Sequence, residues 1–258
     1  MKNEQKQRVQ ETFSKNKKAY VQSSTHNNPE DLNLLIEWLN PEKQWRVLDA
    51  ATGGGHVAKA VQPFVNRVYA TDLTKEMLQN TAAHLSDMAN IVFVVADAEE
   101  LPFLDGYFDA VTCRIAPHHF PDPATFVSEV SRVLKPGGRF LMIDNTAPED
   151  DQLDQFYNAF EKRRDPSHVR ALKVSEWEAL FNGQSLGVKK HLKRQKTLPF
   201  SSWVARTQSC PVEQHAIEQD LLSADTHTKA YFSITSSDSG LEHFSIDEYM
   251  VLLEKGSC

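Results

Sequence analysis

A run of apolar residues, an acid and three glycines stands out near position 50, in Val47-Leu48-Asp49-Ala50-Ala51-Thr52-Gly53-Gly54-Gly55. Glycine lets a backbone take positive φ and approach a ligand closely, because it has no Cβ. The apolar residues that follow the glycines have helical spacing, and the first amides of a helix bind polar or anionic groups. A strand, a glycine loop and a helix in this order are typical of sites for adenosine-containing cofactors.

Two cofactor classes are compatible with this loop. From Asp49 it reads as acid-x-Ala-x-Gly-x-Gly, a variant of the loop that binds S-adenosylmethionine (SAM). From Gly53 to Ala58 it fits the G-x-G-x-x-A fingerprint of dinucleotide sites. The second interpretation predicts an NAD(P)-dependent oxidoreductase, but the chain has no Tyr-x-x-x-Lys pair to support one.

Acids follow two further apolar stretches. Asp72 follows Val68–Thr71 and could accept hydrogen bonds from both ribose hydroxyls of an adenosine, or it could cap the next helix. Asp97 follows Ile91–Ala96 and could accept from the adenine amine, or it could be a solvated turn residue. Both cofactor classes use an acid such as Asp72. Asp97 favours SAM, because a nicotinamide site does not require it.

The elements that carry these residues alternate along the chain. Strands are predicted at 46–49, 67–71, 91–96, 108–114, 139–144, 188–196 and 246–254, and helices at 55–61, 75–86, 124–134, 150–163 and 175–182. This order predicts an α/β fold with three layers (α/β/α), a Rossmann-like, mostly parallel sheet and ligands at the carboxyl ends of the strands. Residues 91–96 are all apolar, as expected for a strand covered on both faces. Residues 199–243 are expected to form a helical insertion.

Five segments in this order resemble class I SAM-dependent methyltransferases, most closely the ubiquinone/menaquinone biosynthesis C-methyltransferases. They are VLDAATGGGHVA, YATDLTKEML, VVADAEELPF, FDAVTCRIAPHHF and EVSRVLKPGGRFLMID. The resemblance covers about residues 30–150 and extends more loosely to both ends. It implies a seven-stranded sheet with an antiparallel last strand, and SAM as the methyl donor.

The resemblance also implies a set of cofactor-binding residues. Those expected near the methionine and ribose are Asp49, Gly53, Gly54, Gly55, Asp72 and Leu73. Those expected near the adenine and beneath the cofactor are Met77, Asp97, Ala98, Arg114 and Ile115. Tyr20 belongs to an N-terminal segment, residues 1–30, that is expected to close over SAM. Ala51 stands where the family often has its first glycine, so we expect a slightly displaced loop that still binds.

Three histidines are candidate catalytic residues. Methyl transfer is accelerated by alignment of the reacting atoms, and it needs a general base only if the acceptor must lose a proton. His118 and His119 follow the fourth strand, with His119 the likelier inward residue, and His168 lies in the polar cluster Arg164–Arg170, expected over the acceptor pocket. An imidazole can take a proton near neutral pH, although a structural role stays open for each. Adjacent histidines rarely chelate one metal, so no metal site is predicted.

Composition restricts the remaining possibilities. The chain has 258 residues, a net charge of −7 and three separated cysteines, Cys113, Cys210 and Cys258. This length fits a single domain, residues 1–258. The negative charge argues against a nucleic-acid partner, and the cysteine spacing against a disulfide framework or a structural zinc site. The absence of an apolar signal core or membrane-length run leads us to expect a cytoplasmic protein without a membrane partner.

The sequence therefore predicts a SAM-dependent methyltransferase, monomeric or homodimeric, that acts on a small-molecule acceptor. The methyl group is expected to go to carbon or oxygen, with a quinone-like or aromatic acceptor as one possibility. A SAM-binding module without catalysis remains an alternative, and an oxidoreductase a weaker one. Aromatic residues in the expected insertion could line an acceptor pocket, but core packing is the favoured interpretation for them.

Overall fold

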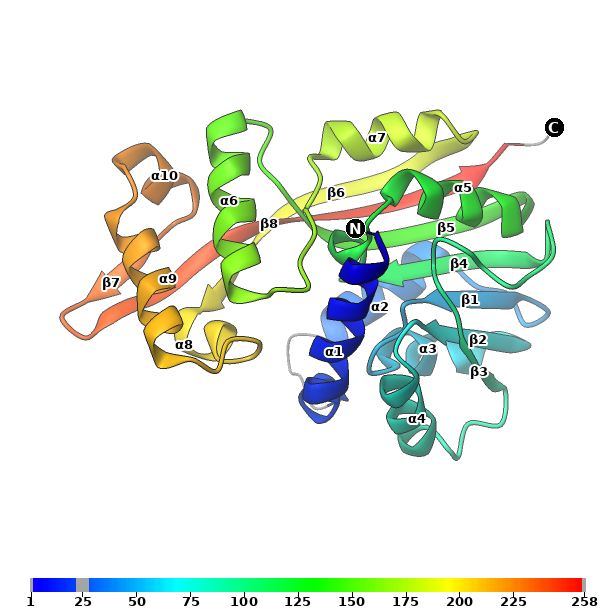
Figure 1. Ribbon diagram of the computed structural model, residues 1–258. Coiled ribbons are helices and arrows are strands. Elements are labelled where there is room, and N and C mark those ends of the chain that lie inside the picture. The colour runs from blue at the N-terminus through cyan, green and yellow to red at the C-terminus, as the bar shows by residue number, and fades with distance from the viewer. Residues whose placement is uncertain (1, 22–27, 257–258) are drawn as a thin grey trace.

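The computed structural model describes residues 2–21 and 28–256, with the side chains of residues 15–21 left aside. One sheet runs through it in the order β3-β2-β1-β4-β5-β8-β6, and β7 pairs with β8 (Figure 1). The strands are β1 (Arg46–Ala50), β2 (Arg67–Asp72), β3 (Ile91–Val95), β4 (Phe108–Arg114), β5 (Leu134–Thr146), β6 (Leu186–Pro199), β7 (Thr235–Ser237) and β8 (Gly240–Lys255).

The sheet is mostly parallel. Strands β1 to β5 pair in parallel, and β8 runs antiparallel to both β5 and β6. The predicted fold class, with an antiparallel last strand, is confirmed. The seven predicted strands form the continuous path, and the three-residue β7 is an addition that the sequence did not indicate.

Helices cover both faces of the sheet. The helices α5 (Pro123–Val133) and α7 (Val174–Asn182) lie on one face, and α2 (Pro29–Leu39) and α3 (His56–Val61) on the other (Figure 1). Successive strand residues alternate between the two cores, as Val47 and Leu48 do in β1. Both faces of the central strands are therefore largely buried.

The predicted burial of residues 91–96 is wrong. β3 is the edge strand of the sheet and has only β2 as a neighbour. Its residues are mostly half-buried, and Val95 is 52% exposed. An apolar composition therefore does not distinguish this edge strand from the central strands.

A third core lies at the far end of the β6–β8 hairpin. There α6 (Asp151–Arg164) packs with α8 (Phe200–Val204), α9 (Pro211–Ser223) and α10 (Thr226–Tyr231), which gather at one end of the molecule (Figure 1). Residues 199–243 contain α8 to α10 and also β7, while β6 and β8 reach into both ends of that range. The aromatic residues Phe200, Trp203, Phe232 and Phe244 are buried in this core.

The N-terminal helix α1 (Lys2–Val21) crosses the carboxyl edge of the parallel strands beside α4 (Lys75–His84) (Figure 1). Gln10 Nε2 donates to the carbonyl oxygen of Leu73 at 3.0 Å, and Ser14 Oγ donates to Glu76 at 3.2 Å. Within the described residues, no helix has both the length and the apolar character needed to cross a membrane.

Candidate functional site

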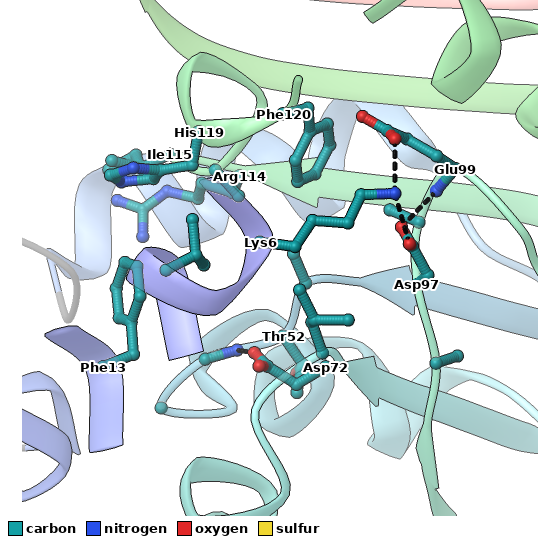
Figure 2. Close-up of a pocket in the computed structure, with 18 of the residues that line it drawn as sticks. Lys6, Phe13, Thr52, Asp72, Asp97, Glu99, Arg114, Ile115, His119 and Phe120 are labelled. Carbon is teal, nitrogen blue, oxygen red and sulfur yellow. Dashed lines mark hydrogen bonds and ion pairs between the residues drawn. The ribbon is translucent and has the colours of Figure 1, made fainter. Parts of the chain in front are cut away.

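A cavity of about 940 Å³, partly open to solvent, lies between α1 and the carboxyl ends of the parallel strands (Figure 2). The predicted residues that line it are Ala51, Gly53, Gly54, Asp72, Leu73, Asp97, Ala98, Arg114, Ile115 and His119. The predicted residues outside its lining are Asp49, Gly55, Met77, His118 and His168. Tyr20 belongs to α1, but its side chain lies outside the described part of the chain.

The glycine loop has a left-handed backbone at three positions. Gly53 has a φ of +52° and Gly55 a φ of +77°, and Ala51 also has a φ of +52°. A Cβ on Gly55 would lie 2.6 Å from a methyl group of Thr81, so the third glycine is needed for packing against α4. Ala51 adopts the conformation that favours glycine, at an energetic cost that its Cβ imposes.

Asp49 supports the loop from below and does not face the cavity. Its carboxylate is 2% exposed and accepts hydrogen bonds from Thr52 Oγ1 at 2.6 Å and Thr112 Oγ1 at 2.8 Å. Burial raises the pKa of Asp49 to about 6, and the two hydroxyls only partly offset this effect. Asp49 therefore holds the loop in place, and its expected position along the methionine and ribose of a cofactor stays a prediction.

Asp72 lies between the glycine loop and the start of α4. Its Oδ1 accepts from the backbone N–H of Thr74 at 2.8 Å, beside the start of α4, and its Oδ2 accepts from Gly53 N–H at 3.0 Å. It also lines the cavity (Figure 2). Met77, in contrast, is fully buried outside the lining, so the structure does not place it where the resemblance implied.

Asp97 and Glu99 form a clamp around Lys6 of α1. Lys6 Nζ lies 2.5 Å from Asp97 Oδ2 and 2.6 Å from Glu99 Oε2 (Figure 2). Burial tends to lower the pKa of Lys6, but the two carboxylates outweigh it and the pKa is raised. Sequence reasoning missed Lys6, because nothing in the polar N-terminal segment marks one lysine among several.

Ile115 is strained at the floor of the cavity. Its φ is +52°, which is unusual for a β-branched side chain, and its N–H donates to the carbonyl oxygen of Ile143 at 2.7 Å. Neighbouring Arg114 is 9% exposed and pairs with Asp31 at 3.3 Å. Strain of this kind concentrates at ligand sites, where the surrounding structure holds the backbone in place.

His119 lies in the cavity wall with a defined tautomer. Ser167 Oγ donates to Asp165 Oδ1 at 2.5 Å, so it accepts from His119 Nδ1–H, 3.2 Å away. The basic nitrogen of His119 is therefore Nε2. Burial, followed by the charge of His118, lowers the pKa of His119 to about 3, so the imidazole is neutral. Phe13 of α1 meets its ring edge-on at 5.1 Å.

The other two histidines have different surroundings. His118 Nδ1 lies 2.6 Å from Asp144 Oδ1; burial opposes its charge, but Asp144 prevails and the pKa of His118 is raised. His168 is 1% exposed, and its Nε2 donates to Asn158 Oδ1 at 2.9 Å. Because His168 lines neither this cavity nor the second one described next, the structure does not support the prediction that it is a catalytic base.

A second cavity, of about 520 Å³ including its open part, adjoins the first. The two share Phe13, Ile115 and His119. The remaining walls come from η2 (Pro117–His119), β5, α6, the loop after it, β6, α8, the residues that follow α8, and β8. Arg164 lies in this wall, whereas Arg170 is outside it and pairs with acids of α6 and α7.

Comparisons with known proteins identify the family to which this chain belongs. A family model for a methyltransferase domain matches residues 48–142. Over 230 residues, 88% of this chain and 91% of the relative, the sequence is 39% identical to the uncharacterized methyltransferase YcgJ of Bacillus subtilis (strain 168). The chain belongs to the methyltransferase family. It is a SAM-dependent methyltransferase, as the sequence predicted, and the dinucleotide interpretation of Gly53 to Ala58 is not needed.

One solved structure and one further relative also resemble this methyltransferase. The crystal structure of a candidate methyltransferase of Bacillus halodurans C-125 superposes with a TM-score of 0.86 and 39% identity, covering 88% of this chain and 100% of that one. The ubiquinone/menaquinone biosynthesis C-methyltransferase UbiE of Brucella suis is 36% identical over 142 residues, 52% of this chain and 53% of that protein. The second similarity thus covers about half of each chain.

Proposed function

We propose that this methyltransferase binds SAM in the first cavity and transfers its methyl group to a small molecule in the second. The observation that carries the proposal is the junction of the two cavities at Phe13, Ile115 and His119. A donor on one side and an acceptor on the other would meet there. Catalysis by alignment requires such a meeting point.

The first cavity fits SAM in shape and in chemistry. Gly53 presents backbone to the cavity, and a Cβ there would meet no atom within 4 Å, which leaves room for the methionine part. Asp72 is suited to the ribose hydroxyls, and Asp97 with Ala98 to the adenine. When bound, SAM supplies a methyl group made electrophilic by the adjacent sulfonium.

His119 would orient the acceptor and receive its proton. A pKa of about 3 keeps the imidazole neutral, so Nε2 can accept a hydrogen bond from a hydroxyl or amine of the acceptor. Such a weak base takes a proton readily only after methylation has made the oxygen or nitrogen strongly acidic. Ser167 and Asp165 would hold Nε2 in this role by fixing the tautomer.

Calorimetry with S-adenosylhomocysteine (SAH), the product of methyl donation, tests the donor site. We expect binding by the wild type and a loss of about tenfold or more in Asp72→Ala, since a carboxylate hydrogen bond is worth about 1.5–3 kcal/mol. Asp105→Ala is the control, because that side chain is 81% exposed and lies outside the cavity. Absence of SAH binding, or equal binding by Asp72→Ala, would refute the donor site.

Isotope-labelled SAM incubated with a small-metabolite extract tests the transfer. We expect a labelled product with the wild type, and slower labelling with His119→Asn at unchanged SAH affinity. Binding of SAH without any transfer would instead favour the SAM-binding module. Equal rates for the wild type and His119→Asn would remove His119 from the chemistry.

A further inference from the structure

Two residues that line the second cavity each have a buried side-chain oxygen without a hydrogen-bond partner among the described residues: Oε1 of Glu161 and Oδ1 of Asn145. Glu161 is 2% exposed, and two N–H groups of Arg164 donate to the same carboxylate oxygen, Oε2, at 3.0 and 2.7 Å. Oε1 is thus left without a donor. A buried acceptor in this state is unfavourable unless a ligand or solvent donates to it.

The positive charges of the second cavity are already engaged. Arg164 is held by Glu161 and by Thr207, and its guanidinium lies 4.6 Å above the ring of Trp203. Lys196 Nζ pairs with Glu248 Oε2 at 2.8 Å. Arg206 also interacts with other groups of the protein. An anionic acceptor would therefore have to displace existing partners, which argues against the use of Arg164 to bind an anion.

Five side chains add apolar surface to this wall, which also holds His118, His119 and Asp165. Phe13, Ile115, Leu198, Trp203 and Ile246 contribute aromatic and aliphatic surface. These side chains come from α1, the turn after β4, β6, α8 and β8, so they surround the cavity from several directions. Such a wall favours a compact aromatic or aliphatic body, with polar recognition confined to a few atoms.

We propose that Glu161 and Asn145 select the acceptor by accepting hydrogen bonds from it. The acceptor is then a compound without negative charge, with a compact apolar or aromatic body and either a hydroxyl that donates to Glu161 Oε1 or Asn145 Oδ1 or an amino group that can donate to both. This inference rests on the proposed function, because it takes the second cavity to be the acceptor site. It assigns to these two residues a specificity that no sequence motif indicated.

Three probes that share a 4-methylphenyl body test the proposal on the full-length protein saturated with SAH: 4-methylphenol, 4-methylaniline and 4-methylanisole. The first carries a hydroxyl, the second an amine, and the third no donor. Ligand-observed NMR titration should show 4-methylphenol or 4-methylaniline binding about tenfold more tightly than 4-methylanisole. Comparison of the first two identifies which donor is preferred. Equal binding of all three, or no binding of either donor probe, would overturn the proposal.

The variant Glu161→Gln sharpens the test. Arg164 still needs an acceptor, so the amide oxygen should replace Oε2 and the NH₂ group should replace Oε1. The wall then presents a donor, and the preference should shift towards 4-methylanisole. Asn145→Leu keeps Glu161, and it should weaken the preference for the two donor probes over 4-methylanisole. Glu176→Gln is the matched control, because its partner is also an arginine, Arg170, outside both cavities.

SAH affinity, measured in parallel, separates this proposal from the proposed function. A wild type that fails to bind SAH would refute the proposed function itself. A wild type that binds SAH but does not distinguish the three probes would refute only the selection by Glu161 and Asn145. A Glu161→Gln protein that keeps wild-type SAH affinity and the wild-type preference would also refute it, since the acceptor oxygen would then be irrelevant.

Discussion

On the proposed function, in which Asp97 binds the adenine, we predict that Lys6 competes with the cofactor for Asp97 and that its removal strengthens binding. The adenine amine and the Lys6 ammonium are both donors, and Asp97 Oδ2 already receives Lys6 at 2.5 Å while its Oδ1 receives the backbone N–H of Glu99 at 2.9 Å. Both oxygens are therefore in use before a cofactor arrives. The adenine amine would then share the Asp97 carboxylate with Lys6 or displace it, and either event weakens the ion pair.

The size of the effect follows from the exposure of the clamp. The Lys6 side chain is 21% exposed, Asp97 24% and Glu99 6%, so water screens the ion pairs in part. Exposed pairs contribute about 0.2–1 kcal/mol each, and we take about 1 kcal/mol for the whole clamp. Its removal should raise the fraction of binding-competent molecules and tighten SAH binding about fivefold in Lys6→Gln.

Calorimetric titration with SAH at constant ionic strength is the assay. Lys2→Gln is the matched control, because Lys2 lies on the same helix and pairs with Asp122, but it is 61% exposed and outside the cavity. We expect its SAH affinity to equal that of the wild type. Unchanged or weaker binding by Lys6→Gln would refute the competition and would mean that Lys6 contributes to the bound state.

Three further predictions concern stability. Gly55→Ala should lower the free energy of unfolding by about 2–4 kcal/mol in urea titrations, because its φ is +77° and the new Cβ would meet Thr81 and Leu85 at 2.6 and 2.7 Å. Ala51→Gly should raise it by about 1 kcal/mol and increase the melting temperature, since glycine tolerates a φ of +52°; an unchanged melting temperature would contradict the assigned strain. The pKa of His119 falls from 6.5 in the unfolded chain to about 3, so in that window the unfolded chain binds the extra proton and acid destabilises the fold. His119→Gln should therefore reduce the loss of stability between pH 6 and pH 4, by up to about 1.4 kcal/mol per pH unit, and urea titrations at a series of pH values would show whether it does.

The central strands could be predicted because buried strands have many apolar residues that are close together in the sequence. Within residues 108–114, Phe108, Val111 and Cys113 enter one core and Ala110 enters the other. An acid marks the end of several strands, as Asp72 does for β2 and Asp97 for β3. The edge position of β3 could not be predicted, because the order of strands in a sheet is a property of the whole chain and a run such as 91–95 looks the same in either place.

Some residues of the site could likewise be predicted from the sequence, and others could not. Asp72 and Asp97 could be placed in the cavity from their positions after two strands, since the carboxyl ends of parallel strands meet at one edge. Lys6 and Glu161 could not, because each reaches its cavity from a helix whose packing no local pattern reveals. Met77 faces the core and not the cavity, a difference of orientation on α4 that residue spacing alone did not resolve.

The two cavities draw on different stretches of the chain. Apart from the three side chains of α1, Lys6, Val9 and Phe13, the first cavity is built within residues 51–121, which lie inside the segment matched by the methyltransferase model. Most of the second comes from residues 145–246, which lie outside that segment. On the proposed function, acceptor choice can therefore change by substitution in one stretch while the donor site in the other is kept. The same separation suggests a practical route to altered products, in which residues 145–246 are diversified and residues 51–121 are left as they are.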